Sequence, residues 1–412
     1  MQDVLKRATG NYVVGDQFWD RETELALFIE RLREGAHLLL TAPRRTGKTS
    51  LMLEAARRLQ DDYLCLYVDL QKSHSPADAI VELALASHKH APLWEKTKSV
   101  FRNVLDGIES IKFEELAVTL RSGLTAGDWQ SKGDSLFEIL AANSKPVVLL
   151  LDEVPILVNR LLKGSDYTIT PERRATADAF LSWLRSNGIR HPGKITMVIA
   201  GSIGLEPVVR QGGLSATLNT LTPFELRPWS RETAAACLRA LAAGHQLTLP
   251  PEAVDEMLDR LGVCIPHYVQ MFFDYAYREA RLRGGNEVSR DLAAEVYRHS
   301  MLGTRGHAEL THLEERLTTV LGPQLQLLAL DLLTEAAVAA SLSSAAAEVL
   351  ARAHCGEEWI ERLRDVLAIL EHDGYLRARG GSYVFVSRLL KDWWKARFKF
   401  AYVPVKKRSP RR

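Results

Sequence analysis

Short apolar runs alternate with segments of helical periodicity along roughly the first 230 residues. Four runs rich in branched or aromatic residues predict β-strands at residues 37–41, 64–70, 147–151 and 195–200. The last two runs are almost continuously apolar, as expected for strands buried on both faces of a parallel sheet. Helical patterns fall between the strands at residues 48–59, 76–87, 113–120 and 173–187. The alternation predicts an α/β layer around a parallel sheet, with a shorter fifth strand at residues 224–226.

Beyond Pro228 the strand pattern stops and the periodicity becomes helical. With Ser230 and Ser289 as N-caps, amphipathic helices are predicted at residues 230–243, 251–261, 266–282 and 289–299. After about residue 307, helical stretches are predicted at residues 324–334, 342–353 and 357–373. Two β-like runs at residues 375–377 and 383–386, with a glycine turn between them, precede a last helix at residues 387–400. Three helices followed by a hairpin are the element order of a winged helix.

Composition and charge indicate a globular protein of two or three domains. Of the 412 residues, 46% are hydrophobic and 25% are charged, so each domain can bury a sizeable core. The 53 basic and 51 acidic residues nearly cancel, so any electrostatic argument must be local. Four widely spaced cysteines favour a reducing compartment over a disulfide framework. Because no run resembles a signal peptide or reaches the ~18 apolar residues of a membrane span, we expect a cytoplasmic protein with no membrane association.

One octet between a predicted strand and a predicted helix has the pattern of a phosphate-binding P-loop. It reads Ala42-Pro43-Arg44-Arg45-Thr46-Gly47-Lys48-Thr49, is followed by Ser50, and has Ala42 where the first glycine usually stands. Backbone N–H groups of such a loop bind phosphate oxygens, and the positive end of the following helix dipole adds to the attraction. Lys48 reaches the β- and γ-phosphates of ATP, and the Thr49 hydroxyl ligates Mg²⁺. The alternative is a chance Gly-Lys-Thr sequence on a surface loop.

A second motif follows in the order that a P-loop nucleotide site requires. Residues 147–153 form a buried strand that ends in Asp152 and Glu153. In a Walker B strand, Asp152 would hold Mg²⁺ through its water shell, and Glu153 would orient and deprotonate the attacking water. An Asp-Glu helix cap is the alternative for this motif alone. Because both motifs end predicted strands in the right order, the sequence predicts magnesium-dependent ATP binding, with Lys48 and Glu153 as catalytic residues.

A third polar position follows the strand predicted at residues 195–200. Ser202 stands two residues beyond that strand. We assign it as a candidate catalytic residue that senses the γ-phosphate through a hydrogen bond, and a turn hydroxyl is the alternative.

These motifs together resemble the prokaryotic AAA+-like ATPases of the STAND group, often called the archaeal-type ATPase family. The most specific match is the Pro-Arg-Arg-x-Gly-Lys-Thr-Ser-Leu pattern within residues 42–51. The other matching segments are residues 14–25, 151–153, 200–205, 224–230 and the Gly-x-x-x-Pro segment at 262–267. They span about residues 10 to 300, and residues 383–394 also match the family's winged helix.

The resemblance implies an α/β fold with a parallel-sheet, AAA+-like P-loop NTPase core, an α-helical lid and a winged-helix domain. The corresponding domains are residues 1–228 (core), 229–304 (lid), 305–400 (winged helix) and 401–412 (basic tail). It also implies that Pro266 and His267 approach the nucleotide from the lid, with a helix start as the alternative role of Pro266. Arg190 and Arg210 are candidates for an arginine finger, with a surface position or a structural ion pair as the alternative for either one.

Charge in the last third of the chain is distributed unevenly. The helix predicted at residues 357–373 is the third of the winged helix, and its many acidic residues would be repelled by nucleic-acid phosphates. From Ser387 onward, ten Lys or Arg residues accompany one acidic residue, Asp392. This segment is therefore a candidate contact for duplex DNA or an acidic protein surface. A solvated helix face followed by a disordered basic terminus is the alternative.

Two functions are compatible with these features. The first is a nucleotide-driven regulatory switch, with ATP hydrolysis that is slow without a partner and with nucleotide-dependent assembly into a homo-oligomer. The second is a DNA-acting ATPase whose winged helix and basic tail engage duplex DNA. A binding module with vestigial hydrolysis is disfavoured, because Lys48, Thr49 and the acidic pair at residues 152–153 are all present.

Overall fold

The computed structural model describes residues 5–8, 10–105, 113–124 and 127–408. These residues form two compact units. The core unit consists of Arg21–Thr41 and Lys48–Leu226, and the C-terminal unit consists of Met1–Asp20, Ala42–Gly47 and Arg227–Arg412. The chain therefore leaves the core unit after Thr41 and returns to it at Lys48. The six residues in between, Ala42–Gly47, belong to the C-terminal unit.

A five-stranded parallel sheet forms the centre of the core unit, with strand order β2-β3-β4-β1-β5. The strands are β1 (Leu38–Thr41), β2 (Leu64–Asp69), β3 (Val147–Asp152), β4 (Ile195–Ala200) and β5 (Thr222–Glu225). All residues of β3 and β4 are buried, as their apolar runs predicted. The expected fold class is therefore confirmed for the core, although the fifth strand begins two residues before its predicted position.

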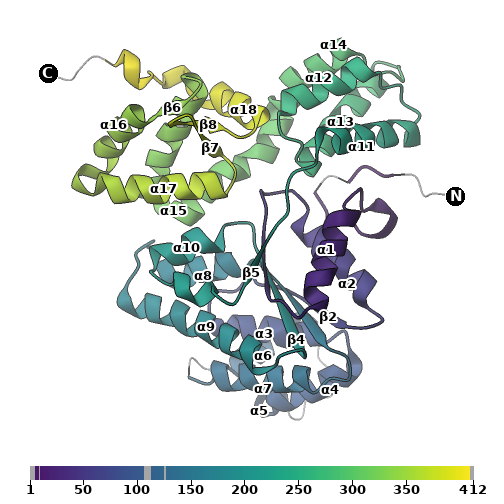
Figure 1. The fold of residues 1–412 in the computed structure, drawn as a ribbon, viewed down its shortest axis with the longest axis vertical. Coiled ribbons are helices and arrows are strands. Elements are labelled where there is room, and N and C mark those ends of the chain that lie inside the picture. Colours follow the sequence, from purple (N-terminus) through teal and green to yellow (C-terminus); the bar gives the residue numbers. More distant parts are fainter. Residues whose placement is uncertain (1–4, 9, 106–112, 125–126, 409–412) are drawn as a thin grey trace. The chain divides into compact units, whose positions relative to one another are not determined.

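Helices cover both faces of this sheet, with α1 and α2 on one side and α8, α9 and α10 on the other (Figure 1). Side-chain caps fix some of their starts: Ser75 accepts from the Asp78 N–H at the start of α3, and Thr170 accepts from the Arg173 N–H in α9. The helices are α1 (Glu22–Arg33), α2 (Lys48–Leu59), α3 (Pro76–Ser87), α4 (Ala91–Val100), α5 (Arg102–Leu105), α6 (Phe113–Ser122), α7 (Trp129–Ala141), α8 (Val154–Lys163), α9 (Pro171–Arg190) and α10 (Leu205–Gln211).

The C-terminal unit begins with helices that agree closely with the sequence pattern. They are α11 (Arg231–Gly244), α12 (Pro251–Leu261), α13 (Pro266–Leu282) and α14 (Arg290–Val296), and a π-helical turn at Tyr297–Met301 follows. The side chains of Ser230 and Ser289 accept hydrogen bonds from the Thr233 and Leu292 N–H groups, so both predicted N-caps are confirmed.

Helix α15 (Thr304–Val338) leads into the last part of this unit. Gly322 has φ 77° and precedes Pro323, so the helical path is interrupted inside this element. Among the described residues, α15 contains the one stretch long and apolar enough to cross a membrane. Half of that stretch is buried within the protein's own structure, as is typical of a core helix.

Helices α16 (Ser344–Cys355), α17 (Trp359–His372) and α18 (Arg388–Phe398) complete the unit together with a small sheet. The sheet is antiparallel, with order β6-β8-β7, and its strands are β6 (Leu342–Ser343), β7 (Leu376–Arg379) and β8 (Ser382–Phe385). Gly380 and Gly381 form the predicted turn, with φ 55° and 73°. The prediction of helix at residues 342 and 343 is wrong, because both residues pair with β8 and Ser343 then caps α16.

The segment after α18 is folded onto the unit. The carboxylate of Glu335 is buried, and its Oε2 accepts hydrogen bonds from the Tyr402 hydroxyl and the Val405 N–H, both at 3.0 Å. Trp393 and Trp394 are buried, and Trp394 contacts the rings of Tyr375 and Phe385. The alternative of a disordered basic terminus therefore does not hold for residues 402–408, which have an ordered attachment.

Candidate functional site

The P-loop connects the end of β1 to the start of α2, as its sequence context predicted. Arg45 and Gly47 have left-handed backbone conformations, with φ 64° and 103°. Thr46 is 1% exposed, and its hydroxyl donates to the Pro43 carbonyl oxygen at 2.7 Å, which closes the loop into a turn. Ala42 does not have a positive φ, so an alanine fits this position without backbone strain. Left-handed positions next to a helix N-terminus form the kind of backbone concavity that binds anions.

The first residues of α2 lie beside the end of β3 in the core unit. Lys48 is the first residue of α2 and is 8% exposed, as is Ser50. The Thr49 hydroxyl donates to Asp152 Oδ2 at 3.0 Å. The P-loop motif and the acidic end of β3, which are about a hundred residues apart in sequence, thus contact each other through these two side chains.

The Asp152 carboxylate is 6% exposed, and three donors orient it. Its Oδ2 accepts from the hydroxyls of Thr49 and Tyr67, each at 3.0 Å, and its Oδ1 accepts from the Glu153 N–H at 3.0 Å. Burial and the negative charge of Asp152 raise the pKa of Tyr67 far above its usual range, so this hydroxyl keeps its proton and donates. Tyr67 was missed by the sequence analysis; its only signal was a tyrosine near the end of the neighbouring strand.

Glu153 occupies the turn between β3 and α8 in a left-handed conformation, with φ 60°. Its Oε2 accepts from the Ser202 hydroxyl at 2.8 Å and from the Ser202 N–H at 2.9 Å. The structure therefore brings the two predicted catalytic residues Glu153 and Ser202 into direct contact. Whether Ser202 also senses the γ-phosphate stays a prediction.

The Thr49–Asp152 pair fits Mg²⁺. A hydroxyl and a carboxylate oxygen 3.0 Å apart are ligands of the type that Mg²⁺ prefers, and this ion usually completes its shell with waters and substrate phosphates. No group of three or more His, Cys, Asp or Glu side chains suited to a metal occurs among the described residues.

The remaining predicted residues lie in several places. Pro266 is buried at the start of α13, next to Ile265 as N-cap. Arg190 ends α9, and its Nη1 lies 3.7 Å from Asp134 Oδ2, which is the ion pair considered as the alternative to an arginine finger. Arg210 is exposed near the end of α10. The arginine-finger assignments stay predictions.

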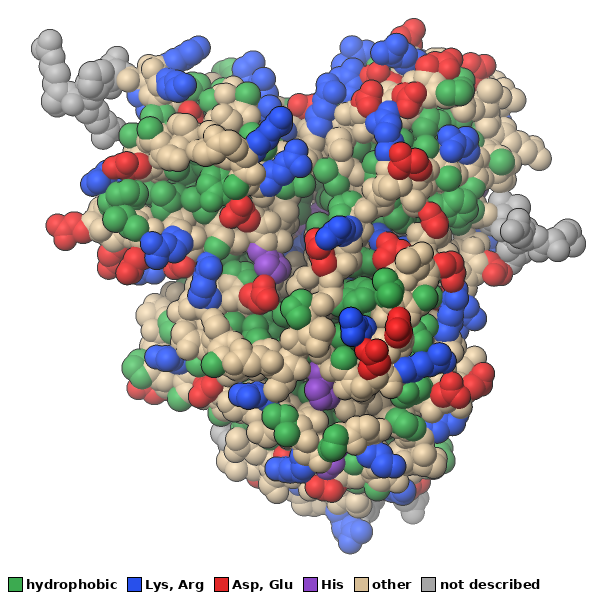
Figure 2. All heavy atoms as spheres, viewed as in Figure 1, with side chains coloured by type: hydrophobic (Ala, Val, Ile, Leu, Met, Phe, Trp, Pro, Cys, Tyr) green, Lys and Arg blue, Asp and Glu red, His purple; other side chains and the backbone are tan. Residues whose placement is uncertain are grey.

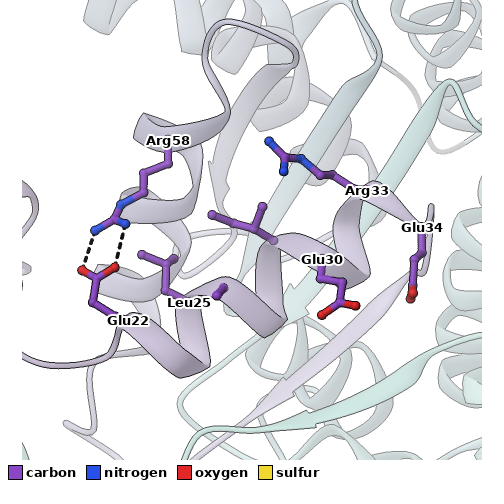
Figure 3. Close-up of a pocket in the computed structure, with 8 residues that line it drawn as sticks. Glu22, Leu25, Glu30, Arg33, Glu34 and Arg58 are labelled. Atoms are coloured by element: carbon purple, nitrogen blue, oxygen red, sulfur yellow. Dashed lines mark hydrogen bonds and ion pairs between the residues drawn. The ribbon is translucent and has the colours of Figure 1, made fainter.

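A separate hollow of about 490 Å³ opens beside α1 (Figure 3). It is lined by the charged side chains of Glu22, Glu30 and Arg33 together with apolar Leu25, and Arg58 of α2 pairs with Glu22 at its edge. None of these residues belongs to the P-loop or to the ends of β3 and β4. We therefore place the candidate nucleotide site at the P-loop and the end of β3, and not at this hollow.

The parallel sheet with its strand order, the P-loop and the acidic end of β3 define an AAA+-like P-loop NTPase fold. The fold is similar to that of the Walker-type ATPase PABY2304 of Pyrococcus abyssi, with a TM-score of 0.60, 16% identity, and coverage of 93% of this chain and 98% of that chain. It is also similar to the ORC2 protein of Aeropyrum pernix in its ADPNP–ADP complexes, with a TM-score of 0.53, 13% identity, and coverage of 91% and 93%. No protein-family model and no curated protein sequence matches the chain. At these identities the likeness establishes the fold alone.

Proposed function

We propose that this protein binds ATP with Mg²⁺ and hydrolyses it slowly, as a nucleotide-driven regulatory switch. The observation that carries the proposal is the contact of Thr49 with Asp152, with Glu153 immediately after it. The fold similarity to Walker-type and AAA+ ATPases supports it.

Each residue of the site has a defined task in this proposal. The N–H groups of the loop and the N-terminus of α2 bind the β- and γ-phosphates, and the Lys48 ammonium offsets their charge. When bound, Mg²⁺ supplies neutralisation of the phosphate charge that develops during transfer. Asp152 is held in orientation by Tyr67, and the Glu153 carboxylate accepts a proton from the attacking water. Ser202 holds the Glu153 carboxylate until the water is in place.

Two substitutions test the binding and the chemistry separately. Lys48→Ala should abolish ATP binding, with Lys145→Ala as the control, since the Lys145 ammonium is exposed and donates to the Gln60 carbonyl oxygen at 3.0 Å. Unchanged ATP affinity in Lys48→Ala would remove the P-loop assignment. Glu153→Gln should keep ATP affinity but lower turnover at least about 100-fold. Its control is Glu138→Gln on the exposed face of α7. Normal turnover in Glu153→Gln would mean that another group activates the water.

The switch would be completed by the C-terminal unit. We propose that residues 229–304 act as the lid, residues 305–400 as a winged helix and residues 401–412 as a basic tail for a partner. The helices α16 and α17, the β7–β8 hairpin and β6 support this proposal. We also propose nucleotide-dependent homo-oligomers, with Arg190 or Arg210 as the arginine finger. Light scattering of the Glu153→Gln variant with and without ATP tests this, and an unchanged mass would refute it.

A second candidate function, a DNA-acting ATPase, is favoured by the charge of α18 and of the segment that follows it. Lys and Arg side chains gather over this end of the C-terminal unit (Figure 2). In the described part of the chain, these five lysines have no ion-pair partner: Lys391, Lys395, Lys399, Lys406 and Lys407. Glu357 and Glu358, just before α17, and Glu361, in its first turn, are exposed, so α18 and the tail fit a phosphate backbone better than α17 does.

Duplex DNA should stimulate ATP turnover if this second function holds. The stimulation should fall in the double variant Lys406→Ala/Lys407→Ala and persist in Lys145→Ala. Substitution is preferable to deletion of the tail, because deletion would leave the buried Glu335 carboxylate without Tyr402 and Val405. If DNA changes the ATP turnover of neither the wild type nor the two variants, the regulatory switch remains the better proposal.

A further inference from the structure

An arginine of the P-loop is held by side chains of the C-terminal unit, to which the loop Ala42–Gly47 belongs. Arg45 Nη1 donates to His267 Nε2 near the start of α13 and to Glu309 Oε2 near the start of α15, the latter at 2.8 Å. Pro43 of the same loop lies near the turn after α17, since a Cβ built on Gly374 would lie 3.6 Å from Pro43 Cβ. The phosphate-binding loop is thus held to α13 and α15 through Arg45.

The two acceptors of Arg45 differ in charge. Burial, with the Arg45 and Arg44 guanidinium groups nearby, lowers the pKa of His267 to about 3, so its ring is neutral and accepts through Nε2. Glu309 Oε2 lies 3.5 Å from the same His267 nitrogen and supplies the negative charge that faces Arg45. The Arg45 side chain is 22% exposed and that of Glu309 is 41% exposed, so solvent screens the pair only in part.

A bound triphosphate would bring negative oxygens to the same guanidinium. Arginine binds phosphate in a forked geometry that a carboxylate also fits, so the two anions are alternative partners for it.

We propose that Glu309 competes with the nucleotide phosphates for Arg45, and so lowers the affinity of the P-loop for ATP and links its occupancy to the start of α15. This inference rests on the proposed ATP binding. Because linkage is reciprocal, ATP binding must weaken the hold of Arg45 on α15 by the same factor by which Glu309 weakens ATP binding. The contact therefore opposes nucleotide binding, and it involves the start of α15, the helix that precedes β6 and α16.

The direct test compares two isosteric substitutions on α15 in the full chain. Glu309→Gln should tighten the binding of a fluorescent ATP analogue about three- to fivefold, the size expected for one partly exposed ion pair. It should lower KM for ATP without raising kcat. Glu315→Gln removes the same charge from an exposed position of the same helix and should leave affinity unchanged. Equal affinity in wild type and Glu309→Gln, weaker binding in Glu309→Gln, or equal tightening in both variants would overturn the proposal.

A double-mutant cycle and hydrogen exchange give independent evidence. In an Arg45→Ala background, the change Glu309→Gln should no longer alter ATP affinity; an effect of undiminished size would show that Glu309 acts without Arg45. In the wild-type protein, ATP should speed amide exchange in residues 304–313, and unchanged or slower exchange there would count against the competition. If wild type binds no ATP at all, the proposed function itself fails, whereas normal ATP binding that is insensitive to Glu309 refutes only this inference.

Discussion

Removal of the Tyr67 hydroxyl should weaken the response of the protein to Mg²⁺ more than its binding of ATP. In the structure, Asp152 Oδ2 accepts from both Thr49 and Tyr67 at 3.0 Å. When the Thr49 oxygen serves as a metal ligand, Tyr67 is the remaining side-chain donor to that carboxylate oxygen. Tyr67→Phe would leave Asp152 with the Glu153 N–H as its oriented donor.

The expected magnitude follows from the kind of contact that is lost. A hydrogen bond to a charged group contributes about 1.5–3 kcal/mol, and loss of a partner that orients a metal ligand typically costs about 10–100-fold in metal affinity or activity. We therefore expect Tyr67→Phe to raise the Mg²⁺ concentration for half-maximal ATP turnover about 10-fold or more. At saturating Mg²⁺, turnover should return to within about threefold of wild type.

The assay is ATP turnover measured over a titration of Mg²⁺, with the nucleotide saturating. Tyr63→Phe is the matched control, because Tyr63 lies one residue before β2 and its hydroxyl makes no hydrogen bond in the described structure. Identical Mg²⁺ curves for Tyr67→Phe and wild type would refute the role given to Tyr67. A loss of turnover that saturating Mg²⁺ does not restore would show that Tyr67 supports the chemistry in some other way.

Three further predictions concern catalysis and stability. Ser202→Ala should lower single-turnover hydrolysis about tenfold with ATP affinity within about twofold, because Glu153 loses the hydroxyl that holds it; an unchanged rate would leave Ser202 as a turn hydroxyl. Burial lowers the pKa of His267 and of His312 from 6.5 to about 3, so between these values the unfolded chain binds protons that the folded chain does not. The free energy of unfolding should therefore be highest above pH 6.5 and should fall as the pH drops towards 3. In denaturant titrations, His267→Gln should make this decrease with pH smaller, and an equal decrease in wild type and variant would contradict the prediction. Trp394→Ala should cost about 3–5 kcal/mol in urea unfolding, since its side chain is 0% exposed, and a loss below about 1 kcal/mol would contradict the packing described for it.

The sequence predicted those parts of the site that depend on chain order. The strands β3 and β4 were predictable because burial on both faces makes their sequences continuously apolar. Lys48, Thr49 and Asp152 were predictable because the carboxyl ends of parallel strands share one edge of a sheet. These predictions require only the pattern of apolar residues along the chain and the positions at which the strands end.

The sequence could not predict contacts that depend on register or on distant folding. Tyr67 reaches Asp152 because Tyr67 pairs with Leu150 in the β2–β3 register, which no motif specifies. Arg45 and Glu309 are 264 positions apart and meet only once the helices after the core have folded. The hydrogen bond from Tyr402 to Glu335 could not be predicted for the same reason. The sequence around an acidic residue in a long apolar helix does not indicate which distant residue will contact it.

Two adjacent carboxylates at the end of β3 have different partners because the backbone turns between them. Asp152 is the last residue of the strand, and its carboxylate accepts from Thr49 and Tyr67. Glu153 has φ 60°, a conformation that costs a non-glycine residue about 1–3 kcal/mol and is most often kept at functional sites. That turn places its carboxylate on Ser202, at the end of the neighbouring strand β4. The left-handed turn replaces the regular alternation of a continued strand, and it accounts for the separate partners of the two carboxylates, Thr49 and Tyr67 for one and Ser202 for the other.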